Sequence, residues 1–191
     1  PRGPRGASDP RPAMRCLALI PLLPALGAAV NGLVGIRYFS KQAAAWFACA
    51  MVGLSLAISL WSVVELLGLP PEAREHMVVV ATWLPPMALE TAAGVGTFTV
   101  DWALRLDPLS AVMILVVSGI GFLIHVYSIA YRHVELRGSY ARFFAYMNLF
   151  VFFMLTLVLG ANFLVMFVGW EGVGLCSYLL IGYWYQKDSA A

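Results

Sequence analysis

Residues 143–186 read FFAYMNLFVFFMLTLVLGANFLVMFVGWEGVGLCSYLLIGYWYQ, and these 44 residues carry one charged side chain, that of Glu171. A helix needs about 20 apolar residues to cross a bilayer core about 30 Å thick. The stretch is therefore too long for one membrane span and long enough for two. Its Gly160-Ala161-Asn162 run is the natural turn. We expect one span near 141–159 and another near 163–185.

The rest of the chain is similarly apolar. Of its 191 residues 61% are hydrophobic and 12% are charged, whereas a soluble domain is about 45–50% apolar and about 25% charged. This composition excludes a disordered chain and a nucleic-acid-binding protein, and a net charge of +2 predicts no polyanionic partner. Cys16, Cys49 and Cys176 lack the spacing of a zinc site or a disulfide framework. The fold class that remains is an all-α integral membrane protein, with the lipid bilayer as its surroundings.

Three further runs without charged residues predict three more spans, at 16–36, 42–64 and 108–131. Asp107 can cap the last of these helices, and Pro108 suits its first position. The intervening segment is more polar. Short strands are predicted there at 78–80 and 96–100, with turns at Pro85-Pro86 and at 94–96. We therefore expect five transmembrane helices with a short extramembrane β-like loop between the second and the third.

These features divide the chain into five segments. Met14 directly precedes the first apolar run and is the expected translation start, so the Pro/Arg-rich residues before it are expected to be untranslated or disordered. A signal peptide is the alternative, but no small-residue cleavage site follows a short apolar core. The segments are the tail at 1–13, the first two helices at 14–69, an external loop at 70–107, the third helix at 108–140, and the fourth and fifth helices at 141–191.

Charge asymmetry between the loops predicts the orientation. Counted from Met14, six Lys or Arg residues fall on one side of the membrane and three on the other. The positive-inside rule places the richer side in the cytoplasm and the 70–107 loop outside. The six are Arg37, Lys41, Arg132, Arg137, Arg142 and Lys187, and the three are Arg15, Arg74 and Arg105.

Glu171 is the main candidate for chemistry, as the ninth residue of the predicted fifth span and thus near the bilayer midplane. A lone carboxylate there costs several kcal/mol unless it is paired, hydrated or protonated. Intramembrane acids commonly serve proton or ion transport, and we expect Glu171 to take up and release a proton. The alternative is a protonated helix–helix hydrogen bond. No Lys or Arg occupies the middle of a span, so a basic partner must come from elsewhere.

Two weaker candidates accompany Glu171. His125, in the third span, could relay protons, or could serve only as a hydrogen-bonded contact to a neighbouring helix. Glu65 lies close enough to Pro70 to reach the interface, which favours a solvated end of the helix. The sequence contains no phosphate loop, haem or iron–sulfur spacing and no nucleophile–base set, so it predicts no redox site within this chain.

Four motifs resemble a known family. They are Leu106-Asp107-Pro108-Leu109-Ser110, GIGFLIHVY at 119–127, RFFAYMNLF at 142–150 and GWEGVGLCSYLLIG at 169–182. Together they resemble the N-terminal part of subunit L (chain 5) of the proton-pumping NADH–quinone oxidoreductase, respiratory complex I. The Trp-Glu pair is shared with related antiporter-like subunits and with sodium/proton antiporters. The run that follows it, together with the His125 motif, points to subunit L. The resemblance covers residues 14–187.

The resemblance implies an antiporter-like membrane-arm subunit of a bacterial inner-membrane complex. Its expected partners are other membrane-arm subunits, and NADH, flavin (FMN), iron–sulfur clusters and quinone belong to other subunits. The 108–140 segment would be the N-terminal region typical of chain 5, and 141–191 the truncated start of the proton-translocation domain. The family's fifth-helix glutamate, matched by Glu171, pairs with a lysine of the seventh helix. Many members have Asp where this chain has Ala161.

Because the chain lacks an initial Met and ends before that lysine, we expect it to be a fragment of a longer reading frame. The function implied is that of the parent subunit: proton translocation coupled to electron transfer from NADH to quinone. Two alternatives remain open at this stage. One is a subunit of a multi-subunit sodium/proton antiporter, and the other is a membrane bundle without transport activity.

Overall fold

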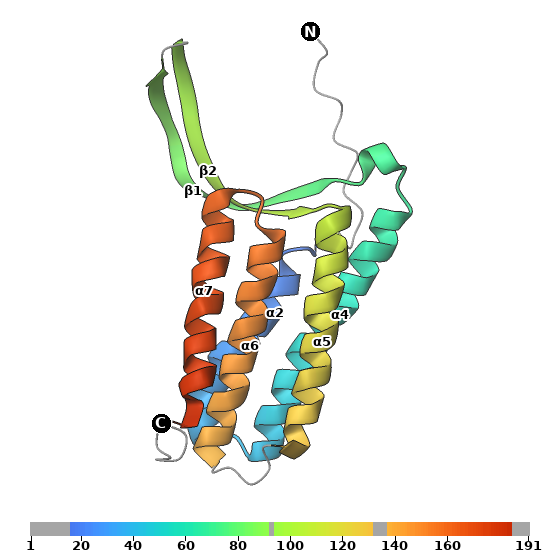
Figure 1. Cartoon of the computed structure of the whole chain (residues 1–191), viewed down its shortest axis with the longest axis vertical. Coiled ribbons are helices and arrows are strands. Elements are labelled where there is room, and N and C mark those ends of the chain that lie inside the picture. Colours follow the sequence, from blue (N-terminus) through green and yellow to red (C-terminus); the bar gives the residue numbers. More distant parts are fainter. Residues whose placement is uncertain (1–15, 92–93, 132–136, 185–191) are drawn as a thin grey trace.

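The computed structural model describes residues 16–91, 94–131 and 137–184. Within these ranges it contains five helices that are long and apolar enough to cross a membrane, which confirms the predicted number of spans. The predicted tail at 1–13 and the loop residues 132–136 lie outside the described residues, as does Lys187. Figure 1 shows the five helices side by side in one bundle, with a β-hairpin at one end.

The first span is Leu19–Tyr38 and combines α2 (Leu19–Val30), the π-helical segment η1 (Asn31–Gly35) and α3 (Ile36–Tyr38). Pro24 is the sixth residue of α2 and lies inside the helix. The other four spans lie within a few residues of the predicted ones. They are formed by α4 (Lys41–Leu67), α5 (Pro108–Tyr131), α6 (Arg137–Leu159) and α7 (Phe163–Ile181), which continues into the 3-10 turn η3 (Gly182–Trp184).

The segment between α4 and α5 forms a two-stranded antiparallel hairpin, preceded by the short 3-10 turn η2 (Pro71–Ala73). Its strands, β1 (His76–Thr91) and β2 (Gly94–Leu106), are much longer than the two short strands expected. The turn expected at Pro85-Pro86 is wrong, because both prolines lie within β1 between the pairs Leu84↔Val100 and Met87↔Phe98. The register shifts there, which accommodates residues that have no N–H for the ladder.

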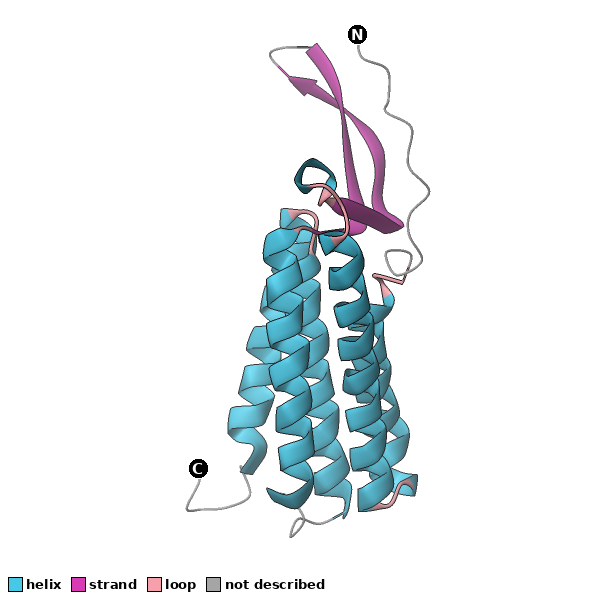
Figure 2. Cartoon of the chain, turned by 90° about the vertical axis from the view of Figure 1, so that its right-hand side faces the viewer, coloured by secondary structure: helices cyan, strands magenta, loops and turns pink. Residues whose placement is uncertain are grey.

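The hairpin is joined to the helices at its base, as Figure 2 shows. Ala161 donates a backbone hydrogen bond of 3.0 Å to the carbonyl oxygen of Ala103 in β2. Asn162 links the same elements, because its Nδ2 donates to the Asp101 carbonyl oxygen at 2.8 Å. Its Oδ1 accepts from the Val165 N–H at 3.0 Å and so caps α7. The predicted turn at 160–162 is therefore confirmed, and it also anchors the hairpin.

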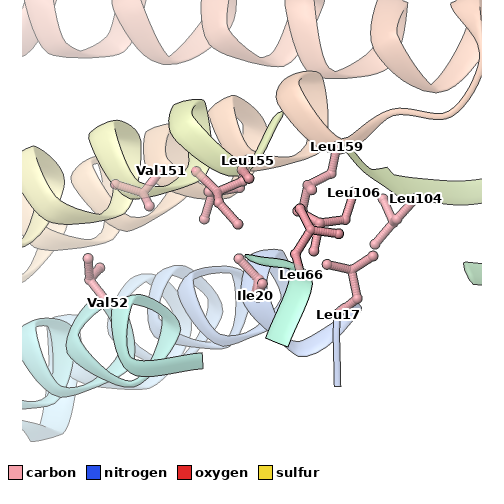
Figure 3. Close-up of a cluster of buried hydrophobic side chains, with 11 residues drawn as sticks. Leu17, Ile20, Val52, Leu66, Leu104, Leu106, Val151, Leu155 and Leu159 are labelled. Atoms are coloured by element: carbon pink, nitrogen blue, oxygen red, sulfur yellow. The ribbon is translucent and has the colours of Figure 1, made fainter. Parts of the chain in front are cut away.

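The main core lies beneath this base. In Figure 3 Leu66 of α4, Leu106 of β2 and Leu159 of α6 point toward one another. Each of the three is at most 1% exposed, so strand and helix ends bury a shared apolar cluster. A second cluster at the opposite end of the bundle includes Tyr140, Phe144 and Tyr183.

Asp107 caps α5, as predicted. Its Oδ1 accepts from the Ser110 backbone N–H at 2.8 Å, and its own N–H donates to the Ser110 hydroxyl at 2.7 Å. Arg105 lies 3.1 Å from the other carboxylate oxygen. Burial alone would raise the pKa of this carboxyl, but the hydrogen bonds from Ser110 and the charge of Arg105 outweigh it, so the pKa lies below its ordinary value.

We expect Asp107→Ala to lower the free energy of unfolding of the chain in detergent by about 1 kcal/mol, because a cap is lost. The stabilisation that depends on the charge of Asp107 is fully present above the ordinary pKa of an aspartate, about 3.9. It is lost as the pH falls through the lowered pKa of Asp107 in the folded chain. Asp107→Asn keeps a cap without the charge and should lack this acid-dependent loss. Thermal unfolding between pH 2 and 7 checks both statements, and identical pH profiles for Asp107→Asn and wild type would contradict them.

Candidate functional site

Glu171 is the ninth residue of α7 and lies on the side of that helix that faces away from the bundle. The buried stripe of α7 consists of Val165, Gly169, Gly172 and Cys176, at the helical spacing of four, three and four residues. Glu171 is exposed, and its neighbour Trp170 is 68% exposed. The helix therefore packs on one stripe and leaves the Glu171 face uncovered by the described part of the chain.

The glycines around Glu171 have two different roles. A Cβ on Gly169 would lie 2.5 Å from the Leu157 backbone nitrogen of α6, and one on Gly172 would meet the ring of Phe153. These two glycines let α6 and α7 approach closely. Gly174 has no atom within 4 Å of its Cβ position and follows Glu171 by three residues, on the same side of the helix. It leaves open space beside the carboxylate.

The described residues provide no ion-pair partner for the Glu171 carboxylate. Within the five spans, the Lys and Arg residues are Arg37, Lys41 and Arg142, which all lie near span ends. Glu171 is ten residues before Ile181, the last residue of α7, which corresponds to about 15 Å along the helix axis. A cation that reaches this carboxylate must come from another segment or another chain.

His125 occupies a different environment, in the interior between α5 and α6. Its side chain is fully buried, and its Nδ1 lies 2.7 Å from the Gly121 carbonyl oxygen. A carbonyl only accepts, so Nδ1 carries the proton and donates. Nε2 then accepts from the Asn148 amide nitrogen at 3.3 Å. The structure does not bring His125 and Glu171 together, because one faces the bundle interior and the other faces away from it.

Sequence reasoning missed Asn148, which forms a buried polar contact of α6. Its Nδ2 also donates to the Phe144 carbonyl oxygen at 3.0 Å, while its Oδ1 is buried without a described partner. A Cβ on Gly27 of α2 would meet this oxygen, so three helices converge here. An amide in an otherwise apolar span was the available signal, because membrane segments seldom carry polar groups without a role.

Glu65 is not fully solvated at the end of α4, contrary to the sequence interpretation. The residue is half-buried, and its Oε2 is buried without a hydrogen-bond partner among the described residues. The Ser62 hydroxyl, one turn earlier on the same helix, is likewise buried and unpartnered within the described ranges. Two polar side chains of α4 with buried oxygens, those of Ser62 and Glu65, therefore lie near its hairpin end, separate from Glu171.

Two protein families match parts of the chain. The family described as NADH-Ubiquinone oxidoreductase (complex I), chain 5 N-terminus, matches residues 93–144. The family described as NADH:quinone oxidoreductase/Mrp antiporter, TM, matches residues 160–191 and therefore includes Glu171. The second match includes all of α7, with its buried stripe and its exposed Glu171 carboxylate.

Individual proteins show the same likeness. The chain is 40% identical to NADH-quinone oxidoreductase subunit L of Pseudomonas aeruginosa over 174 residues, covering 91% of this chain and 26% of that protein. It is 53% identical to subunit L of Escherichia coli over 105 residues, covering 54% of this chain and 17% of that protein. Among solved structures, the Mrp complex from Dietzia is similar, with a TM-score of 0.54 and 29% identity over 86% of this chain and 16% of that chain.

These matches agree with the fold and with the motifs around Glu171. The multi-pass bundle, the hairpin between its second and third spans and the glutamate of its fifth span all occur in one chain of 191 residues. That chain spans about a quarter of the length of the Pseudomonas protein. The chain is a homologue of NADH-quinone oxidoreductase subunit L, the chain 5 family of complex I, over about a quarter of that subunit's length.

Proposed function

We propose that the protein containing this chain is a membrane-arm subunit of the proton-translocating NADH–quinone oxidoreductase. In this function it moves protons across the membrane as electrons pass from NADH to quinone. The observation that carries the proposal is Glu171, an acid in mid-span on the uncovered face of α7. Ionisable residues inside a membrane are functional-site candidates by default, and proton relays are among their known uses.

The proposed chemistry is a charge switch at Glu171. A lysine brought within about 4 Å would favour the carboxylate form, and moving that lysine away would favour the protonated form. Opening the pair therefore takes up a proton and closing it releases one. The resemblance to subunit L assigns the lysine to the seventh helix, and the uncovered face beside Gly174 offers it room.

We further propose that His125 relays protons within the bundle. Its Nε2 accepts from Asn148, so a second proton on the ring requires the Asn148 amide to turn and present Oδ1. That oxygen is buried and lacks a described partner, so it is available to accept from a protonated ring.

We expect His125→Gln to lower the number of protons pumped per electron, by a smaller factor than Glu171→Gln. Glutamine keeps an N–H donor for the Gly121 carbonyl but cannot take up a proton. The ratio is measured in vesicles that contain the native complex, with Ser128→Ala as a control for a change at another buried polar residue of α5. A wild-type ratio in His125→Gln would reduce His125 to a link between α5 and α6.

The remaining components follow from the same proposal. NADH, FMN, iron–sulfur clusters and quinone are bound by other subunits, and this chain contacts neighbouring membrane-arm subunits and lipid. The membrane is the bacterial inner membrane. The hairpin formed by β1 and β2 lies outside the cytoplasm, because Lys and Arg are fewer on that side.

A multi-subunit sodium/proton antiporter is the second candidate. Its support is the similarity to the Mrp complex from Dietzia and the shared family at residues 160–191. The chain 5 match at residues 93–144 and the 53% identity to the Escherichia coli subunit favour the oxidoreductase.

Purification of the native gene product from its own membranes distinguishes the two candidates. An affinity tag on that product should recover NADH–quinone reductase activity that acidifies one side of reconstituted vesicles. Recovery of a cofactor-free complex that exchanges sodium for protons without NADH would overturn the proposal.

A further inference from the structure

A cavity of about 360 Å³ opens at the end of the bundle opposite the hairpin, between the beginning of α6 and the end of α7. Its polar lining comes from Arg142, Tyr146, Tyr178 and Tyr183, and the other lining residues are Leu179, Ile181 and Gly182. The volume falls in the range of small-molecule sites, about 300–1,000 Å³. The proposed proton chemistry at Glu171 makes no use of this cavity.

Arg142 provides the charge of the cavity. Its Nε is buried and has no hydrogen-bond partner among the described residues, although buried donors are normally satisfied. The guanidinium carbon lies 5.4 Å from the centre of the Tyr183 ring, a cation–π distance. The Tyr183 hydroxyl donates to the Ser139 carbonyl oxygen at 2.7 Å, which fixes that ring. The guanidinium is thus held in place with an unused donor.

The charges around the cavity favour an anion. None of the described residues that line it is acidic, so the positive charge of Arg142 is not neutralised within the lining. A guanidinium presents planar N–H donors that match phosphate oxygens in pairs. The hydroxyls of Tyr146 and Tyr178 can donate to the same oxygens.

The depth of the cavity indicates a lipid rather than a solute. Arg142 is the fifth residue of the span Gly138–Leu159, which places it about 6 Å along the helix from the span end. Tyrosines are typical of this headgroup level in membrane proteins. Ile181, which is 86% exposed, adds an apolar side chain to the same lining.

We propose that this cavity binds the headgroup of an anionic phospholipid. Arg142 donates to the phosphate, and the tyrosine hydroxyls complete the contact. Basic pockets between transmembrane helices are suited to such headgroups. The site is separate from Glu171, so the proposal stands or falls independently of the proton chemistry.

Native mass spectrometry of the full chain in detergent tests this site with three probes: dioleoyl-phosphatidylglycerol, dioleoyl-phosphatidylcholine and inorganic phosphate. We expect wild type to retain phosphatidylglycerol in preference to phosphatidylcholine, and inorganic phosphate not to displace it. Arg142→Gln should weaken phosphatidylglycerol binding by about tenfold, which corresponds to the loss of one charge-assisted hydrogen bond. Arg105→Gln, which removes an exposed arginine at the hairpin end, should leave that binding unchanged.

Three results would overturn the proposal. They are equal losses in Arg142→Gln and Arg105→Gln, equal retention of the two lipids by wild type, and displacement of the lipid by inorganic phosphate. Far-ultraviolet circular dichroism checks that each variant keeps its helices. If Arg142→Gln does not fold, Tyr178→Phe replaces it in the test. The Tyr178 side chain is 75% exposed, so removal of its hydroxyl disturbs no packing. Tyr178→Phe should weaken phosphatidylglycerol binding by about threefold, and an unchanged affinity would equally overturn the proposal.

Discussion

Glu171→Gln in the full-length subunit, within its native complex, is expected to reduce proton pumping by about tenfold or more while the complex still assembles. The uncovered position of Glu171 explains why assembly should survive, because the described part of the chain makes no ion pair with this carboxylate. Proton transfer through Glu171, in contrast, should be lost. A partner cation left without its carboxylate in the membrane costs several kcal/mol, and each 1.36 kcal/mol changes a rate tenfold.

The measurement is the number of protons pumped per electron in vesicles, with NADH oxidation by the isolated complex recorded separately. Electron entry from NADH should be unchanged, and quinone reduction should fall only to the extent that it is coupled to pumping. Glu171→Asp should be milder, because the charge remains with a shorter reach. Glu72→Gln, at an exposed carboxylate beside the hairpin, is the matched control and should pump like wild type. Wild-type pumping by Glu171→Gln would make Glu171 a structural contact.

The five spans could be predicted because a bilayer leaves little freedom to the sequence. Long runs without charge have one stable arrangement in lipid, and the turn at 160–162 was visible as a Gly-Ala-Asn interruption. The cap of α5 was readable for a similar reason, since Asp107 and Pro108 both suit a helix start. Local rules of this kind act within a few residues and require no knowledge of neighbouring helices.

The hairpin was predicted poorly because strand pairing depends on a distant partner. Pro85-Pro86 has the local pattern of a turn, but bulges opposite Val100 and Phe98 accommodate it within a long strand. The contact between His125 and Asn148 joins residues 23 positions apart and depends on how α5 and α6 pack. Neither arrangement leaves a periodic signal.

The site was predicted only in part, for a related reason. Its position in mid-span marked Glu171 as a candidate. The sequence left open which side of α7 the Glu171 side chain faces. That direction is set by the packing of Gly169 and Gly172 on α6. Gly169 and Gly172 let α6 approach α7 closely, whereas Gly174 leaves open space beside Glu171.

The same glycines lead to the second large expected effect. Gly169→Ala should destabilise the chain by about 2–3 kcal/mol, since overpacking a close contact typically costs about 1–3 kcal/mol. The added methyl would lie 2.5 Å from the Leu157 backbone nitrogen and 2.6 Å from its Cα. A backbone has no alternative rotamer, so α7 must move away from α6. Such small residues are what allow membrane helices to pack closely.

Gly174→Ala is the matched control, with the same substitution five residues later on the same helix. Its Cβ position is open, so the expected effect has the opposite sign: a gain of up to about 1 kcal/mol from the higher helix propensity of alanine. Thermal unfolding of the two variants in the same detergent measures the difference, about 3 kcal/mol in all. If both substitutions shift stability equally, then α7 does not pack on α6 through Gly169, and the outward direction of Glu171 loses its structural basis.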